Sequence, residues 1–351
     1  MNKLEIRQKA MALKRYQPYL AMIFIQILYA GMALFSKASI SNGMNPYVFV
    51  VYRQAFATLA LAPFAIFLES NKTTSLSFSL LVKIFFISLL GITLSLDLCY
   101  VSISYISATF AAAGTNMIPV ITFILAICFR MESICYKQSH GIAKIIGSVV
   151  CVAGALIYAF VNGPPLYPES HKQVHYLTSN GTSKGEWIKG SLIMLLANTM
   201  WSLWLILQGP IMKQYPAKIR LTTLQCLFSC IQSAIWAISV KRDIAAWKLG
   251  FNFNLLSVAY CGVLVAGLSY WLRAWVIEIK GPVFTAMFTP LSLIVTAVFS
   301  SIFWKETPHL GSVCGAILLV MGLYGVLWGK QKEAECNKKT SDQCKEEINS
   351  I

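Results

Sequence analysis

The sequence predicts an all-α membrane protein with ten transmembrane helices in two inverted five-helix repeats. The first observation is composition, because the 351 residues are 57% hydrophobic and only 12% charged. The mean hydropathy of +0.63 is well above that of a soluble domain. The second is a series of ten apolar runs, and the third is a glycine pattern that recurs in the two halves of the chain.

Each apolar run is close to the roughly 20 residues that a helix needs to cross a hydrocarbon core. The first run follows a basic N-terminus, as in a secretory signal, but its length and the immediately following span favour a retained helix. The runs are 19–38, 46–68, 80–100, 106–129, 142–162, 188–209, 221–240, 254–274, 282–303 and 310–329.

These runs divide the chain into five parts, with long polar segments only after the fifth and the tenth run. Because five is an odd number, the second repeat enters the membrane from the side opposite to the first. The parts are a cytosolic N-terminal segment 1–18, a first five-helix repeat 19–162, an extracytosolic loop 163–187, a second repeat 188–329 and a disordered cytosolic tail 330–351.

The net charge of +15 would suggest nucleic acid in a soluble protein, but here the basic residues lie between apolar runs. With both termini in the cytosol, the inner segments hold twenty Lys and Arg residues and the outer segments eight. This excess predicts that orientation. The loop 241–253 argues against it, and the sequons at Asn71 and Asn180 offer a check, since only Asn180 would lie outside.

Glycines seven residues apart mark the fifth and the tenth run. Gly147-Ser-Val-Val-Cys-Val-Ala-Gly154 resembles Gly315-Ala-Ile-Leu-Leu-Val-Met-Gly322, and the preceding run of each half has a proline followed by an acidic residue. An inverted repeat of this kind places a substrate site between the halves near the bilayer midplane. Glycine at this spacing also simply permits close helix packing, so both interpretations stand.

Several motifs in this order resemble those of plant drug/metabolite exporters with EamA domains, the nodulin-like family called Usually Multiple Acids Move In and out Transporters. The likeness covers roughly residues 15–330. The motifs are Tyr52-Arg53-Gln54, Tyr105-Ile-Ser-Ala-Thr109, Asn116-x-x-Pro119, Gly281-Pro-Val-Phe284, Phe288-Thr-Pro-Leu291, Gly322-Leu-Tyr324 and Leu327-Trp-Gly-Lys330.

The resemblance implies a ten-helix fold and facilitated, often bidirectional, transport of amino acids. Some relatives handle auxin or other organic acids, so auxin or another small acid is the alternative cargo. A membrane receptor or scaffold without transport is the third class. We expect the plasma membrane, with the vacuolar membrane as the alternative; the partners are then the lipid bilayer and a small-molecule substrate, with no nucleic acid.

Polar residues inside apolar runs are the candidates for substrate binding, because a bilayer tolerates them only when they face a cavity or a partner. Arg53 suits a substrate carboxylate, and Gln54 adjoins it in the sequence. Asp97 would modulate the electrostatic environment of Arg53 or accept a proton during transport. An Arg53–Asp97 ion pair, or an arginine that extends to the membrane surface, is the structural alternative.

Two prolines lie within the fourth and the ninth run. Pro119 and Pro290 lack the N–H that would bond the carbonyl four residues back, which leaves the carbonyls of Thr115 and Ala286 for a substrate ammonium or for neighbouring hydroxyls. The other candidates are amides, a hydroxyl and an indole, for which helix contacts or interfacial anchoring are the alternatives: Asn116, Asn198, Trp201, Gln225 and Thr289.

No motif in the sequence predicts an enzyme, a metal site or a cofactor. The four histidines all lie in connectors, and there is no CxxC pair, no nucleophile elbow and no phosphate-binding loop for ATP. We expect neither catalytic residues nor metal ligands, and transport would therefore use existing gradients.

Overall fold

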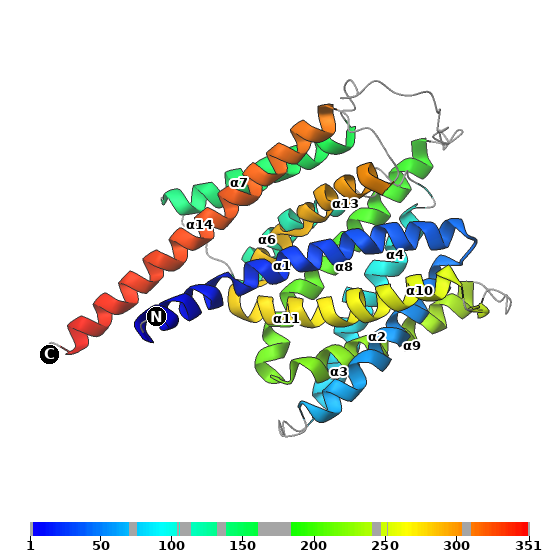
Figure 1. Cartoon of the computed structure of the whole chain (residues 1–351), viewed down its shortest axis with the longest axis horizontal. Helices are drawn as coiled ribbons and strands as arrows, with labels where there is room; N and C mark the ends of the chain where they lie inside the picture. The colour runs from blue at the N-terminus through cyan, green and yellow to red at the C-terminus, as the bar shows by residue number, and fades with distance from the viewer. Residues whose placement is uncertain are drawn as a thin grey trace.

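The computed structural model describes residues 3–69, 76–103, 105, 114–131, 138–160, 184–240, 247–250, 252–303 and 310–349. This part of the chain is all helical (Figure 1). The elements are α1 Lys3–Ser41, α2 Pro46–Phe67, α3 Phe78–Ser88, η1 Leu89–Leu94, α4 Ser95–Ile103, α6 Ile118–Cys128, α7 Ser139–Phe160, α8 Lys184–Gln214, α9 Lys218–Val240, α10 Phe253–Tyr260, η3 Cys261–Leu268, α11 Ser269–Lys280, α12 Pro282–Met287, α13 Thr289–Phe303 and α14 Leu310–Asn349.

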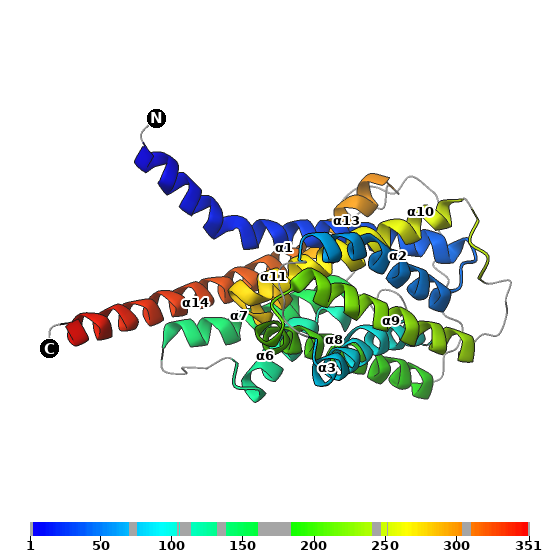
Figure 2. The same cartoon turned by 90° about the horizontal axis from the view of Figure 1, so that it is seen from below.

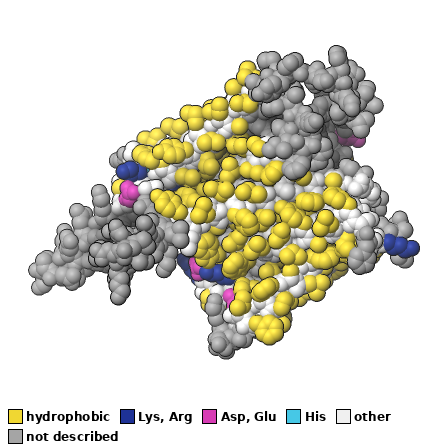
Figure 3. All heavy atoms as spheres, in the orientation of Figure 1, with side chains coloured by type: hydrophobic (Ala, Val, Ile, Leu, Met, Phe, Trp, Pro, Cys, Tyr) yellow, Lys and Arg dark blue, Asp and Glu magenta, His cyan; other side chains and the backbone are white. Residues whose placement is uncertain are grey.

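Seven helical stretches among the described residues are long and apolar enough to cross a membrane. Three shorter apolar helices accompany them, over Ile118–Cys128, Ser139–Gly154 and Pro282–Thr296. Large apolar side chains cover the face seen in Figure 3. Some are strongly exposed, such as Phe78 at 81% and Phe67 at 80%. An apolar exterior of this extent is stable in lipid and would aggregate in water, so the membrane class is confirmed.

Local sequence explains where several helices begin. Asn45 caps α2 by accepting a hydrogen bond from the Tyr47 N–H at 2.9 Å, and Pro46 occupies the first helical position, where its missing N–H costs nothing. Gly281 separates α11 from α12 with φ +86°, a left-handed conformation that favours glycine.

The two proline-containing runs are divided into separate helical pieces. Pro119 lies in the first turn of α6, after a turn at residues 116–117, and Pro290 lies in the first turn of α13, after a turn at Phe288. The prolines therefore start helices. The Ala286 carbonyl accepts the Phe288 N–H, which occupies one of the two lone pairs of this oxygen.

Two π-helical segments interrupt the third and the eighth run, at η1 and η3. The backbone hydrogen bonds of a π-helix span one residue more than those of an α-helix, and such segments often mark a functional site. Here both segments lie next to helices that carry the buried polar residues described below, because α8 packs on η1 and α2 packs on η3.

Helices α7 and α14 form a pair along one side of the molecule (Figures 1 and 2). A Cβ atom on Gly147 would lie 2.7 Å from the Gly322 carbonyl oxygen, and one on Gly154 would lie 2.7 Å from the Leu319 nitrogen. The two glycine motifs of the sequence thus pack directly against each other and let the backbones approach closely.

The end of α14 differs from expectation. The helix continues to Asn349, whereas composition predicts a disordered tail after residue 329. No proline or glycine follows Gly329. Gln331 donates to Glu335 at 3.1 Å across one helical turn, which supports a continuous helix. The start of α1 and the end of α14 project from the same end of the molecule (Figure 1).

Candidate functional site

Two arginines are buried where helices α1, α2, α8 and α11 meet. Arg53 of α2 and Arg273 of α11 are each only 2% exposed. Intramembrane arginines are costly and usually mark a substrate path or a buried partner. We call the group formed by these two residues with Tyr29, Trp201, Trp204 and Tyr270 the arginine–aromatic cluster.

Arg53 is held by Tyr270. Its Nη2 donates to the Tyr270 hydroxyl at 3.3 Å, and its guanidinium carbon lies 6.0 Å from the centre of that ring. Its Nε is buried without a hydrogen-bond partner. Arg53 therefore retains a donor for another group.

Arg273 contacts the cluster through ring faces. Its guanidinium carbon lies 4.7 Å from the centre of the Tyr29 ring and 5.9 Å from that of Trp201. Such cation–π contacts orient a guanidinium but leave its N–H groups unused. Nε and Nη1 of Arg273 are both buried without a hydrogen-bond partner.

The aromatic rings connect the two arginines. Trp201 and Trp204 are stacked with centres 5.0 Å apart, and both contact Tyr270, at 5.8 and 5.4 Å. Tyr270 thus contacts Arg53 as well as both tryptophans. The Tyr29 hydroxyl and the Trp204 Nε1 also lack partners, so the cluster offers several buried polar atoms to a ligand.

Neither arginine forms an ion pair with a described acidic side chain. The described ion pairs lie elsewhere, between Lys144 and Glu333, Lys218 and Glu278, and Lys332 and Glu335. The alternative of an Arg53–Asp97 ion pair is therefore wrong. Asp97 is 2% exposed, and its Oδ1 has no hydrogen-bond partner.

Two glycines bring the neighbouring helices close to the cluster. A Cβ on Gly91 of η1 would lie 2.3 Å from the Trp204 Cβ, and one on Gly262 of η3 would lie 2.7 Å from the Arg53 carbonyl oxygen. A larger residue at either position would displace α8 or α2. The π-helical segments therefore help to set the positions of Trp204 and Arg53.

Some of the other predicted residues gather beside α8. The Asn198 Nδ2 donates to the Gly114 carbonyl at 2.8 Å, just before Thr115 and Asn116. Asn116 and Pro119 are buried. Asn198 lies three residues before Trp201 on α8, so these polar residues lie about one helical turn from the arginine–aromatic cluster.

The remaining predicted residues lie outside this group of contacts. Gln225 of α9 accepts a hydrogen bond from Gln208 of α8 at 2.8 Å and so joins two helices. Gln54 is fully buried, and both its amide atoms lack partners. Thr289 and Pro290 begin α13, where the Thr289 hydroxyl is buried without a partner.

Four residues of the cluster are absent from the site residues predicted from the sequence: Tyr29, Trp204, Tyr270 and Arg273. By sequence alone Arg273 counts among the twenty inner charges, because it lies at the end of the eighth run. Tyr29 and Tyr270 are ordinary aromatics of apolar runs. A useful signal was present, since Tyr270 and Arg273 are three residues apart and thus share a helix face.

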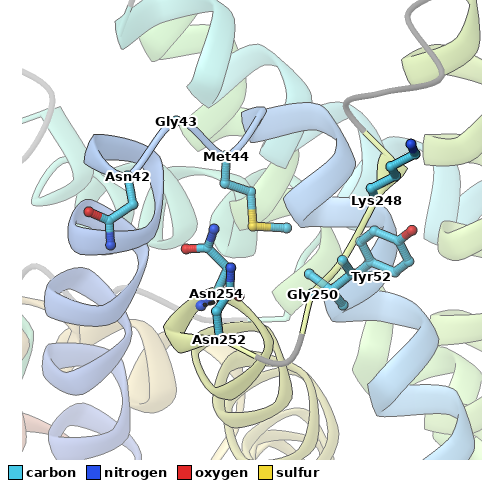
Figure 4. A pocket seen from close by; sticks show the side chains of 9 residues that line it. Asn42, Gly43, Met44, Tyr52, Lys248, Gly250, Asn252 and Asn254 are labelled. Atoms are coloured by element: carbon cyan, nitrogen blue, oxygen red, sulfur yellow. Dashed lines mark hydrogen bonds between the residues drawn. The ribbon is translucent and has the colours of Figure 1, made fainter.

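A small pocket opens at the start of α2. It has a volume of about 130 Å³ and lies between the end of α1, the start of α2 and the segment before α10 (Figure 4). Tyr52 lines it and donates to the Trp247 carbonyl at 2.5 Å. The volume is below the 300–1,000 Å³ of typical ligand sites. A pocket of this size has room for a few water molecules but not for a drug-sized ligand.

Comparisons with known proteins agree on one kind of protein. The model of the EamA-like transporter family matches twice, over residues 17–158 and 188–328. A WAT1-related protein of Arabidopsis thaliana is 59% identical over 94% of this chain and 96% of its own length. Another is 49% identical over 92% of each chain.

Two further similarities are more distant. The Arabidopsis thaliana protein WALLS ARE THIN 1 is 35% identical over 91% of this chain and 85% of its own length. A solved crystal structure with 12% sequence identity has a TM-score of 0.65 and covers 90% of this chain and 98% of its own. That structure shows a shared fold.

Proposed function

Because the chain belongs to the EamA-like transporter family, we propose that it carries amino acids across a membrane by facilitated, bidirectional transport. Membership of a transporter family points to a transporter of small molecules in a lipid environment. Alternating access between the two family-matched regions is the mechanism we propose, since transporters built from repeats bind substrate between them.

One observation carries the proposal. The arginine–aromatic cluster joins residues of both matched regions, with Tyr29 and Arg53 in the first and Trp201, Trp204, Tyr270 and Arg273 in the second. Guanidinium N–H groups bind carboxylates in a planar, paired geometry. Buried N–H groups without partners favour a ligand that supplies acceptors.

We propose ten spans, with both termini in the cytosol of a plasma-membrane protein. The seven long apolar helices and the three shorter ones support this number. The double family match and the projection of both helix ends from one end of the molecule support paired five-helix halves of opposite orientation (Figure 1).

An aromatic organic acid such as auxin is the second candidate. The stacked pair Trp201 and Trp204, together with Tyr270, favours it, because a planar ring gains stacking energy there. In that case Arg53 still binds the carboxylate, and the amide and hydroxyl candidates matter less.

Transport by purified protein in proteoliposomes tests both candidates. We expect saturable uptake of labelled amino acids, with and without a pH gradient, that unlabelled amino acids inhibit more strongly than auxin does. The reverse order of inhibition would favour an aromatic acid. Uptake equal to that of protein-free liposomes for every compound would contradict transport and favour a receptor or scaffold.

A further inference from the structure

We propose that Arg53 and Arg273 together form a double-carboxylate site, so that the substrates bound best carry two acidic groups. The inference rests on the proposed function and names a substrate class for the same site. Dicarboxylates, including the acidic amino acids, belong to this class.

The first step of the argument is charge. An arginine stays protonated in proteins, so the cluster holds two positive charges. Neither is paired with an acid among the described residues. Uncompensated buried charge is costly, and a ligand of matching charge removes that cost. A single carboxylate would neutralise only one of the two arginines.

The second step is the supply of donors. Arg53 Nε, Arg273 Nε and Arg273 Nη1 are buried without partners. Each arginine therefore has at least one donor nitrogen for a carboxylate oxygen, and Arg273 has two. Charge-assisted hydrogen bonds of this kind are about twice as strong as neutral ones. An amide in place of the second carboxyl would bring no charge.

The third step is the origin of the two residues. Arg53 belongs to the region matched at 17–158 and Arg273 to the region matched at 188–328. A substrate with two acidic groups would contact one arginine of each region, beside the Tyr270 and Trp201 rings that link the two arginines. Binding would thus favour the arrangement in which both regions close on the substrate.

Asp97 does not supply the acidic partner that the two arginines lack. It forms no ion pair with either arginine, and its Oδ1 has no hydrogen-bond partner. Its carboxylate therefore stays outside the contacts that hold the two guanidinium groups.

Competition between isosteric substrates tests the proposal in full-length protein in proteoliposomes. Glutamate and glutamine differ by one acidic group at nearly equal size, as do aspartate and asparagine. We expect glutamate to inhibit uptake of a labelled transported amino acid at about tenfold lower concentration than glutamine. Glutamate should also raise the unfolding temperature of the detergent-solubilised protein more than glutamine.

The variant Arg273→Gln assigns the preference to a residue. We expect the substitution to weaken inhibition by glutamate far more than inhibition by glutamine, so that the tenfold ratio falls to about one. Lys189→Gln is the matched control, because Lys189 is an exposed cation over the Tyr105 ring and lies outside the cluster. It should keep the wild-type ratio.

The outcomes separate this proposal from the proposed function. Transport in which glutamine equals or exceeds glutamate would overturn the double-carboxylate site and leave amino acid transport standing. A folded wild-type protein that transports none of these compounds would overturn both. If Arg273→Gln does not fold, the wild-type competition and the unfolding temperatures decide alone.

Discussion

The α7–α14 pair and the arginine–aromatic cluster are both buried helix contacts, yet they are built in opposite ways. In the pair, glycines bring backbones together, and none of the described buried polar atoms without a partner belongs to α7 or α14. In the cluster, five such atoms gather on Arg53, Arg273, Tyr29 and Trp204. The first contact is complete in the protein alone, while the second keeps unused donors, which in our proposal a ligand would satisfy.

The largest effect is expected from Gly322→Leu in the pair. A Cβ there would lie 2.5 Å from the Cys151 nitrogen and 2.6 Å from the Gly147 carbonyl oxygen, and backbone atoms cannot move aside. We expect a loss of about 3 kcal/mol of folding free energy, the upper end for overpacking. Thermal unfolding in detergent measures it.

Gly325→Ala is the control for this change. Its Cβ would lie 3.4 Å from the Gly147 Cα, an ordinary contact distance. The unfolding temperature should stay close to that of the wild type. An equal fall in unfolding temperature from both substitutions would show that close backbone contact does not hold the α7–α14 pair together.

The next effect is expected from Arg53→Gln in the cluster. Removing a charged donor from a buried carboxylate site costs about tenfold to a hundredfold in transport at low substrate concentration. The amount of folded protein should not fall. Uptake into proteoliposomes measures the change, with the exposed cation variant Lys83→Gln as control. Unchanged uptake by Arg53→Gln would remove Arg53 from the substrate path.

A change of opposite sign is expected from Arg273→Met. Replacing a buried charge without an acidic partner by an apolar side chain removes its desolvation cost. We expect the substrate-free protein to gain about 1–2 kcal/mol in stability while glutamate uptake falls. Thermal unfolding without substrate measures the gain. A loss as large as that of Gly322→Leu would mean that Arg273 holds the fold together.

The smallest effect is expected from Trp201→Phe. The ring face toward Arg273 is kept, but a weaker cation–π partner replaces the indole. We expect the substrate concentration for half-maximal uptake to rise about two- to fivefold, from a loss of about 0.5–1 kcal/mol. Trp271→Phe is a matched tryptophan control outside the cluster. Equal changes from both would argue against a specific role for Trp201.

The sequence predicts that buried polar and aromatic side chains form the site, but it does not tell which of them come together. Arg53 and Trp201 stand out as polar or amphipathic residues in apolar runs, and the structure brings both into the cluster. Gln225, Thr289 and Pro290 stand out equally, yet they contact other helices or begin one. Periodicity places a residue on a helix face, but it does not say which helix that face meets.

The sequence by itself determined the membrane class, the helical content and the family, because a bilayer admits only long apolar helices here and because motifs recur in order. The number of spans and their orientation stay predictions. Tertiary structure alone decided that Arg273 is buried beside Tyr29 rather than at the inner surface, and that Asp97 does not pair with Arg53. These facts depend on contacts between residues more than forty positions apart, which helix packing sets and local sequence does not encode.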